Sequence, residues 1–395
     1  MSKKKKVLML ASVASMIDQF NMPNIQMMQK MGYEVHVACN FLEGNTCDAN
    51  RIRKFQQLLT NMDVKQHQWD CPRNIGCLKK CLTAFWQLWR LTRQHHFEWM
   101  HCHSPVGGAL SRIVSHFRKI SVIYTAHGFH FYQGAPFKNW LLYYSAERLL
   151  AYWTDVLITV NKEDYTLAKN HLKAGNICRI PGVGIDVQRF QNCAKDKAAK
   201  DRNVIRKRYN IPQDAIVLLS VGELSKRKNH QEVLKALAQM KRQDLYYLIC
   251  GQGAMEKRLI QKAKKYNILK YVRFCGFQED VETICRSADI FVFPSLQEGF
   301  PAALMEAMAA GLPCIVSDIR GNRELIADQM RFQPGRTKEM QRILDEVIRN
   351  PQLLMHLGDR NQEQIKKYDV QKVNCKMKKI YDSIRVSASY GRTKA

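Results

Sequence analysis

Two glutamates eight positions apart stand out among the residues that could do chemistry. Glu298 lies in an expected loop after a strand, and Glu306 lies inside an expected helix over residues 301–310. Pro301 fits the first helical position, because its ring presets φ and it has no N–H to leave unpaired, and Gly311 fits the end. The amino terminus of such a helix suits a phosphate or sugar hydroxyls. A carboxylate accepts hydrogen bonds from two vicinal hydroxyls, so the segment predicts a site for a ribose or a hexose.

A basic loop follows an expected strand in the same half of the chain. The strand Ile216–Val221 runs into Gly222, and Lys226, Arg227 and Lys228 follow a few residues later. A loop that leads from a strand into a helix presents backbone N–H groups, which makes it a natural diphosphate site. The simpler alternative is a solvated basic loop.

Histidines gather in the first half of the chain. His127 ends an expected strand beside Gly128, and the carboxyl end of a parallel strand faces the ligand crevice of such folds. His130 is expected to be structural. His101 and His103 have the spacing of one strand face, so we expect them to line or pack the crevice and not to bind metal.

Short apolar runs alternate with longer amphipathic stretches in two series. The expected strands of the first series are Val7–Ala11, Glu34–Ala38, Trp99–Cys102, Val122–Thr125 and Val156–Val160. Those of the second are Ile216–Val221, Tyr246–Cys250, Val272–Cys275, Ile290–Phe293 and Cys314–Ser317. Expected helices include Pro23–Met31, Cys77–Arg93 and a basic tail over Pro351–Arg385. The alternation predicts an α/β protein with two doubly wound, mostly parallel sheets.

A polar segment separates the two series. Ala194–Tyr209 is rich in lysine and arginine and has no strand pattern. We therefore expect a Rossmann-like first domain over 1–190, a basic linker over 191–210, a second Rossmann-like domain over 211–375 and a helical tail over 376–395.

Composition excludes several classes of protein. The 395 residues are 46% hydrophobic, enough for real cores and too many for a disordered chain. The 13 cysteines are odd in number and scattered, which fits a reducing cytoplasm better than a secreted disulfide framework. Cys71, Cys77 and Cys81 lack a familiar metal-binding spacing, so no metal site is predicted. The start, MSKKKKVLMLASVAS, imitates a signal peptide but also fits a buried first strand, which we prefer. We expect no transmembrane helix, because no apolar run of about 18 residues occurs.

The segment around the two glutamates resembles the signature of the family 4 glycosyltransferases. Their pattern places two glutamates eight positions apart within E-G-(small/apolar)…E-A-M-A-x-G-x-P. This sequence matches at Glu298, Gly299, Glu306, Ala307, Met308, Ala309, Gly311 and Pro313. Members are retaining enzymes of the GT-B fold, in which two Rossmann-like domains face a cleft. The stretch from Ser317 to Glu324 also resembles capsule and exopolysaccharide members of the family.

The resemblance implies roles for individual residues. Glu306 would hold the nucleotide ribose and Glu298 would lie by the donor sugar. Lys228 matches the lysine that neutralises the diphosphate, and His127 matches the active-site histidine. The backbone around Gly299, Phe300, Pro301 and Ala302 would bind sugar and phosphate, with Gly222, Arg227, Gly276 and Phe277 completing the donor site. Many relatives have arginine where this chain has Glu223, and Lys226 or Arg227 could replace that cation.

These features predict a retaining glycosyltransferase that uses a nucleotide sugar, most simply a UDP-sugar, without a cofactor or a metal. The expected acceptor is a saccharide, lipid-linked, in surface polysaccharide synthesis. Alternatives are a nucleotide-sugar 2-epimerase or a sugar phosphorylase on the same fold. The net charge of +27 also allows a nucleic-acid-binding protein, but the charge is spread and no nucleic-acid module is recognisable, so no nucleic-acid partner is predicted.

The charge also predicts a cytoplasmic protein held at an anionic membrane surface, the inner face of the plasma membrane. Basic residues alternate with aromatic ones between Arg73 and Arg93, and an aromatic-rich stretch, Phe137–Tyr144, follows later. Basic groups near anionic lipid and aromatic rings at the interface both favour such binding. The alternative is that the aromatic side chains pack helices onto the sheet.

Overall fold

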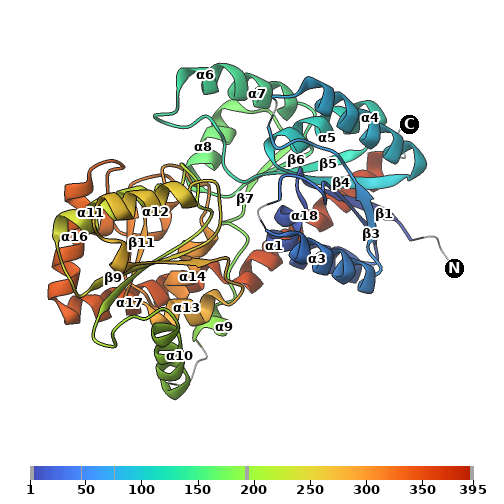
Figure 1. Ribbon diagram of the computed structural model, residues 1–395. Helices are drawn as coiled ribbons and strands as arrows, with labels where there is room; N and C mark the ends of the chain where they lie inside the picture. The colour runs from blue at the N-terminus through green and yellow to red at the C-terminus, as the bar shows by residue number, and fades with distance from the viewer. Residues whose placement is uncertain (1–3, 46, 75, 192–194, 392–395) are drawn as a thin grey trace. The chain divides into compact units, whose positions relative to one another are not determined.

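Two parallel β-sheets with their covering helices form the computed structural model (Figure 1). It describes residues 4–45, 47–74, 76–191 and 195–391. The chain divides into two units: the first runs to Val183 and resumes at Val373, and the second is Gly184–Lys372. The predicted α/β class with two doubly wound sheets is confirmed.

The first unit contains a seven-stranded sheet in the order β3-β2-β1-β4-β5-β6-β7, with every pair parallel. Its strands are β1 Lys6–Leu10, β2 Glu34–Cys39, β3 Lys65–Gln68, β4 Phe97–His103, β5 Ser121–Ala126, β6 Val156–Thr159 and β7 Asn176–Arg179. Successive side chains of β1 enter opposite cores: Val7 and Met9 pack on one face of the sheet, and Leu8 and Leu10 on the other. The apolar run expected as the first strand is thus an inner strand of the sheet, at Lys6–Leu10.

Helices connect these strands. They are α1 Ala14–Phe20, α2 Met22–Lys30, α3 Ala49–Asn61, α4 Leu78–Gln94, α5 Pro105–Arg118, α6 Phe137–Asn139, the π-helical turn η1 Trp140–Tyr144, α7 Ser145–Ala151 and α8 Lys162–His171. The last helix of the chain, α18 Val370–Gly391, joins them from Val373 onward. Tyr381 on α18 is fully buried and stacks on Trp99 of β4 with ring centroids 5.1 Å apart. The expected tail over 376–395 is therefore not separate in its described part, because its side chains from Met377 to Ile384 pack into the core of the first unit. Residues 392–395 of that tail lie outside the described residues.

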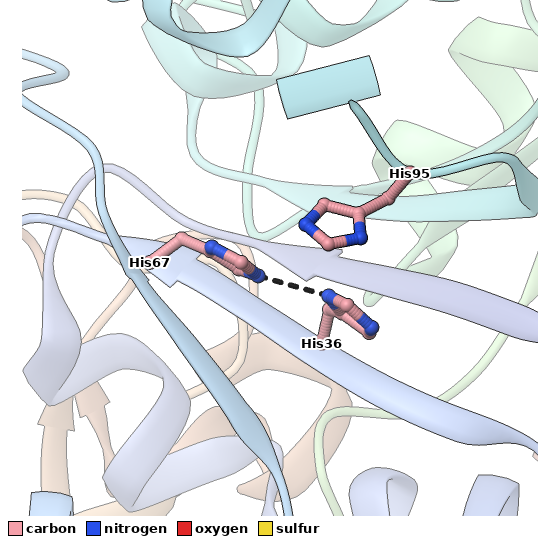
Figure 2. Close-up of side chains that lie close together, drawn as sticks. All are labelled: His36, His67 and His95. Carbon is pink, nitrogen blue, oxygen red and sulfur yellow. Dashed lines mark hydrogen bonds between the residues drawn. The ribbon is translucent and has the colours of Figure 1, made fainter. Parts of the chain in front are cut away.

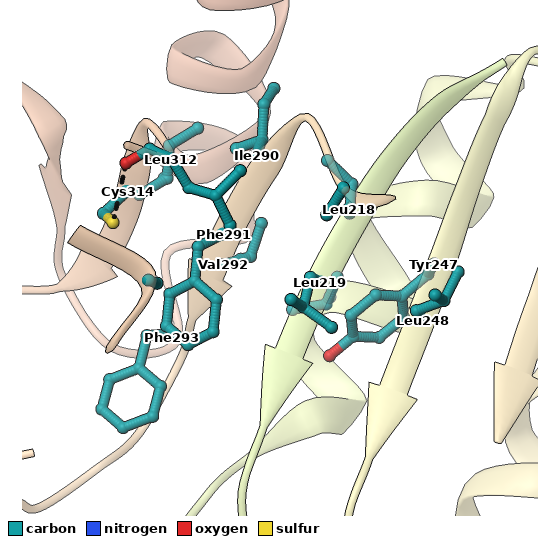
Figure 3. Packing of buried hydrophobic residues seen from close by; sticks show 14 of the residues in the cluster. Leu218, Leu219, Tyr247, Leu248, Ile290, Phe291, Val292, Phe293, Leu312 and Cys314 are labelled. Atoms are coloured by element: carbon teal, nitrogen blue, oxygen red, sulfur yellow. Dashed lines mark hydrogen bonds between the residues drawn. The ribbon is translucent and has the colours of Figure 1, made fainter. Parts of the chain in front are cut away.

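The second unit contains a six-stranded sheet in the order β10-β9-β8-β11-β12-β13, also parallel. Its strands are β8 Ile216–Val221, β9 Leu245–Cys250, β10 Val272–Gly276, β11 Ile290–Phe293, β12 Cys314–Ser317 and β13 Arg331–Phe332. Apolar side chains of its central strands are buried on both faces, which explains their continuous apolar runs in the sequence. Figure 3 shows part of this core, with residues of β8, β9 and β11 beside one another.

The helices of the second unit complete the α/β alternation. They are α9 Val187–Gln191, α10 Lys195–Arg208, α11 His230–Met240, α12 Glu256–Lys265, α13 Val281–Ser287, α14 Ala302–Ala309, α15 Asn322–Leu325, α16 Thr337–Arg349 and α17 Pro351–Ile365, with the short 3₁₀ turns η2 Leu269–Tyr271, η3 Asp328–Met330 and η4 Lys366–Tyr368.

The segment expected to be a basic linker is mostly helix α10 in the second unit. Its Arg206 is fully buried and donates to Asp289 at 2.8 Å and to the carbonyl of Ala215 at 2.7 Å. Arg286 of α13 pairs with Asp201 at 2.8 Å. The unit boundary at 183/184 thus precedes the expected boundary at 190, and residues 192–194 of the expected linker lie outside the described residues.

The cysteines that the structure describes are all free thiols. In the described part of the chain, no helix is both long and apolar enough to cross a membrane.

Candidate active site

A carboxylate between two cations forms the centre of the candidate site in the second unit. Oε1 of Glu298 lies 2.8 Å from Nζ of Lys228 and 2.8 Å from Nη1 of Arg227. Glu298 is 8% exposed, and Nζ of Lys228 lies 4.5 Å from the ring centroid of Phe293 at the end of β11. The structure thus brings together three residues that the sequence singled out separately.

The charges of the two cations decide the state of this carboxylate. Burial alone raises the pKa of Glu298, but the nearby Lys228 and Arg227 and their hydrogen bonds outweigh burial and lower that pKa below its ordinary value. Glu298 is therefore a carboxylate at neutral pH, and it occupies hydrogen-bonding positions of both cations. An anionic ligand of Lys228 would have to compete with it.

Backbone contacts hold the basic loop against the loop that carries Glu298. The N–H of Leu296 donates to the carbonyl of Arg227 at 2.8 Å, and Nη1 of Arg227 donates to the carbonyl of Gln297 at 2.9 Å. Gly251 has φ +145°, and a Cβ there would lie 1.9 Å from the carbonyl oxygen of Gly222. Only glycine fits that approach, so the G-x-G turn after β9 lets the loop after β8 lie close against it.

The helix that follows Glu298 begins one residue later than expected. Pro301 has extended backbone angles and precedes α14 as its N-cap, so Ala302 is the first helical residue. The side chain of Pro301 has no group that could accept a hydrogen bond, so this N-cap residue leaves the first N–H groups of α14 without a side-chain cap. Gly321, with φ +79°, approaches closely: a Cβ there would lie 2.6 Å from the carbonyl oxygen of Gly299. The stretch after β12 thereby supports the loop that leads into α14.

Glu306 is partly buried on α14, in an environment unlike that of Glu298. Its carboxylate has no hydrogen bond or ion pair within the residues that the structure describes. Burial raises its pKa to about 7, and the charge of Arg189 opposes that rise only in part. Hydroxyl groups of a ligand would stabilise the ionised form of such a carboxyl, because their hydrogen bonds replace those that water makes to an exposed carboxylate.

The remaining predicted donor residues occupy loops at the carboxyl ends of the strands. Gly222 follows β8, and a Cβ there would lie 3.1 Å from Cε of Lys228. Gly276 ends β10 and accepts from the N–H of Gly251 at 2.7 Å. Phe277 is 39% exposed, and Phe300 packs partly buried against the core. All of these loops lie at the same edge of the sheet, where open α/β sheets bind ligands.

The two cations proposed to replace a missing arginine differ in their contacts. Arg227 pairs with Glu298, whereas Lys226 is exposed and has no ion pair within the described part of the chain. Arg227 is therefore the better placed of the two.

His127 lies in the first unit, just after β5. Its Nε2 is 3.0 Å from Nδ1 of His103, and the rings of His103 and His101 lie 4.3 Å apart. His101 contacts Oγ1 of Thr125 at 2.8 Å and the hydroxyl of Tyr381 at 2.9 Å. Burial lowers the pKa of His127 to about 4, so its ring is neutral at pH 7 and can donate or accept a hydrogen bond.

His101, His103 and His127 line a small cavity of about 30 Å³, together with residues of α2, β6 and α18. The cavity has room for water. His130 instead stacks on Tyr143, with centroids 4.7 Å apart. The packing position expected for His101 and His103 thus agrees with their burial. The contribution of α18 could not be seen in the sequence, because Tyr381 lies 280 residues from its partner His101.

A larger cavity, of about 660 Å³, opens at the carboxyl ends of β2 and β3. Charged and polar side chains line it: Asn40, Glu43, Asp70, Arg73, Lys80 and Thr83. Sequence reasoning did not single out this cavity, since its polar residues come from two separate loops and from helix α4 and have no motif of their own.

Two family models match most of the chain between them. Residues 201–364 match the family described as "Glycosyl transferases group 1", and residues 6–161 match "Glycosyl transferase 4-like". The chain is 32% identical to EpsD of Bacillus subtilis (strain 168), named as a glycosyltransferase, over 388 residues that cover 96% of this chain and 97% of that protein. This chain belongs to the group 1 glycosyltransferases, the GT4 family of retaining enzymes in the EC 2.4 class.

Two further matches agree with this family. A UDP-Gal:α-D-GlcNAc-diphosphoundecaprenol α-1,3-galactosyltransferase of Escherichia coli is 29% identical over 265 residues, which cover 65% of this chain and 67% of that enzyme. The solved structure of Anabaena HepE in complex with UDP and glucose has a TM-score of 0.78 at 17% identity and covers 96% of this chain and 100% of that one. The GT-B fold implied by the sequence is confirmed, and the chain is a glycosyltransferase that uses a nucleotide sugar.

Proposed function

We propose that this enzyme transfers a sugar from a UDP-sugar, with retention, to a lipid-diphosphate-linked saccharide in the synthesis of a surface polysaccharide. The observation that carries the donor half is the arrangement of Lys228 and Arg227 on Glu298, next to the uncapped amino terminus of α14. Two cations and a helix amino terminus suit the two phosphates of a nucleotide sugar. The printed names of relatives, which act on UDP-Gal and diphosphoundecaprenol or bind UDP and glucose, support the choice of UDP and of a lipid-linked acceptor.

In this proposal the diphosphate displaces Glu298 from Lys228. The released carboxylate then accepts hydrogen bonds from hydroxyls of the donor sugar, while Lys228 and the α14 backbone hold the phosphates. As the glycosidic bond to the diphosphate breaks, negative charge grows on the leaving oxygen, and preorganised cations stabilise it. The leaving diphosphate takes the proton of the acceptor hydroxyl, so the reaction needs no separate protein base.

The other donor contacts follow from the same arrangement. Glu306 accepts hydrogen bonds from the ribose hydroxyls, and the loops after Gly222 and Gly276 surround the nucleotide, with the exposed ring of Phe277 beside the base. His127 donates a hydrogen bond to the donor sugar as a neutral ring. The chain's own cations do the work of a divalent metal ion, so we expect transfer to persist in excess EDTA.

The acceptor half of the proposal rests on the cavity at β2 and β3. Polar residues there suit a saccharide, and helix α4 begins beside it with exposed apolar side chains. Leu78, Leu82 and Trp86 are 73%, 52% and 62% exposed, among exposed lysines such as Lys79. A surface of this composition suits the headgroup region of an anionic membrane, where a lipid-linked acceptor resides.

The alternative given by the sequence is that these aromatic side chains pack helices onto the sheet, and it holds for some of them. Phe85 and Trp89 are partly buried against the core, whereas Trp86 projects outward. On the second aromatic stretch, Phe137, Leu141 and Leu142 are exposed while Trp140, Tyr143 and Tyr144 pack inward. The exposed members are the ones that the membrane proposal uses.

A screen of UDP-sugars for UDP release, with and without a diphosphate-linked acceptor, tests the proposed function. We expect one UDP-sugar to be hydrolysed slowly alone and turned over faster with the acceptor. Conversion of a UDP-sugar without acceptor into its 2-epimer would identify the epimerase instead, and release driven by inorganic phosphate would identify a phosphorylase. Salt-sensitive DNA binding without any UDP-sugar turnover would contradict the proposal.

Vesicle co-sedimentation tests the membrane part separately. Binding to anionic vesicles should fall at high salt and in a Leu82→Ser, Trp86→Ser variant, and it should be weak on neutral vesicles. Equal binding to both vesicle types would contradict electrostatic docking.

A further inference from the structure

Three histidines from distant parts of the sequence converge at one edge of the first unit's sheet. His36 lies on β2, His67 on β3, and His95 ends helix α4 just before β4 (Figure 2). One ring nitrogen from each lies within 4.8 Å of the others. The closest pair, Nδ1 of His36 and Nε2 of His67, is 2.8 Å apart.

Strand register explains this convergence. Ala38 pairs with His67 across β2 and β3, and His36 lies two residues before Ala38, so both imidazoles lie on the same face of the sheet. The ring centroids of His36 and His95 lie 4.8 Å apart, and those of His67 and His95 lie 5.5 Å apart. Figure 2 shows the His95 ring over the other two from the neighbouring connection.

Glu34 fixes the tautomer of the central histidine. Oε1 of Glu34 lies 2.9 Å from Nε2 of His36, and an ionised carboxylate only accepts hydrogen bonds, so neutral His36 carries its proton on Nε2. Nδ1 of His36 then has a lone pair directed at the other two rings. A carboxylate behind a histidine is the usual partner that orients a metal-binding imidazole.

The three rings are shielded from solvent to different degrees. His36 is buried, and His67 and His95 are partly buried. A neutral imidazole has the lone pair that a metal ion requires. The apolar ring of Phe97 packs edge-on to His36, with ring centroids 5.1 Å apart, and covers one side of the cluster.

We propose that His36, His67 and His95 bind one divalent transition-metal ion, with Zn²⁺ as its simplest occupant and water as the fourth ligand. Zn–N bonds of about 2.0–2.1 Å in a tetrahedral site place ligand nitrogens roughly 3.3 Å apart. The His36–His67 pair is already closer than that. His95 is only partly buried at a helix end, and the proposed site requires its side chain to rotate, because the ring nitrogens now lie up to 4.8 Å apart.

Metal binding here would fasten the edge strand β3 and the α4–β4 connection to the neighbouring strand β2. His36 lies in the first half of β2, His67 is the third of the four residues of β3, and His95 precedes β4, whereas His127 follows the carboxyl end of β5. In this proposal the ion is structural, and its effect is on the stability of the first unit and not on sugar transfer.

The chain offers a matched control in two adjacent histidines. His95 belongs to the cluster and its neighbour His96 is exposed. Untagged protein stripped with EDTA is titrated with Zn²⁺ and with Co²⁺ for wild type, His95→Ala and His96→Ala. We expect one equivalent to bind to wild type and His96→Ala, and the affinity of His95→Ala to fall by more than about 100-fold, since even outer hydrogen-bond partners of metal sites cost 10–100-fold.

Two further measurements distinguish loss of the metal site from misfolding of a variant and from metal binding by cysteine thiols. The Co²⁺ complex should show visible bands without thiolate charge transfer, which distinguishes histidine from cysteine ligands. Glu34→Gln should bind about 10–100-fold more weakly while its metal-free melting temperature stays near that of wild type. Added Zn²⁺ should raise the melting temperature of wild type and His96→Ala but not that of His95→Ala. Equal metal affinity in wild type and His95→Ala, or no binding to wild type at micromolar Zn²⁺, would overturn the proposal.

Discussion

Replacing Glu306 by glutamine should stabilise the second unit at alkaline pH. Burial raises the pKa of the Glu306 carboxyl from 4.5 to about 7, so the folded state holds its proton through a range where the unfolded chain has lost it. The difference, 7 − 4.5, is about 2.5 pKa units, and at 1.36 kcal/mol per unit the ionised group costs about 3 kcal/mol above pH 7. Below pH 4.5 both states are protonated and the cost is absent.

The sign of the effect follows from proton binding. Between pH 4.5 and 7 the folded state binds more protons than the unfolded state, so stability falls as the pH rises. Glutamine does not titrate and removes this fall. Between pH 5 and 8 the advantage of Glu306→Gln over wild type should grow by about 2–3 kcal/mol, which corresponds to about 5–10 °C in the melting temperature of a unit of this size.

Calorimetry of both proteins at pH 5 and pH 8 measures this change. Glu346→Gln on helix α16 is the matched control, because Glu346 is exposed, with 60% of its side chain accessible, and should show no such growth. The reasoning is refuted if the gap between Glu306→Gln and wild type stays constant across that range. Saturating UDP should abolish the gap, because bound ribose hydroxyls stabilise the charged carboxylate.

The other predictions address catalysis, loop packing and the terminal helix. Lys228→Ala should lower UDP-sugar turnover about 100–1,000-fold with little change in melting temperature, whereas Lys226→Ala should retain wild-type turnover in the same assay. Gly321→Ala should lower both the melting temperature and the affinity for UDP, because its Cβ would lie 2.6 Å from a backbone carbonyl at a φ of +79°; an unchanged affinity would contradict the packing of the two loops. Tyr381→Phe should cost about 1 kcal/mol of stability in the first unit by urea unfolding, through the lost hydrogen bond to His101, and no loss would show that this bond contributes nothing.

Most of the strands that were predicted correctly have long apolar runs, although the edge strand β10, VRFCG, was also predicted despite its arginine. Central strands such as β8, IVLLSV, are buried on both faces, so their sequence carries the signal directly. The missed strands are at the edges or nearly so: β3 reads KQHQ, β7 reads NICR, and β13 has two residues. A polar edge strand is specified by its neighbour's hydrogen bonds and not by its own composition, so periodicity could not identify it.

The candidate site likewise combines residues that a local motif indicates with contacts between distant residues that no motif indicates. Glu298 and Glu306 could be chosen because they lie within one dense motif, and Lys228 because of its position after a strand. The contact of Arg227 with Glu298 joins residues 71 positions apart, and nothing in the local sequence indicates which of several cations makes it. The histidine cluster depends on strand register alone, since 31 residues separate His36 from His67.

Affinity for UDP, measured by titration calorimetry on wild type and Glu306→Ala, tests the central claim most directly. The claim is that the second unit binds the donor nucleotide through Glu306 at the helix that follows Glu298. The account predicts that wild type binds UDP and that Glu306→Ala, still folded by circular dichroism, binds about 10–150-fold more weakly, since a charge-assisted hydrogen bond contributes about 1.5–3 kcal/mol. Equal affinity in the two folded proteins, or no binding of UDP to wild type, would contradict it.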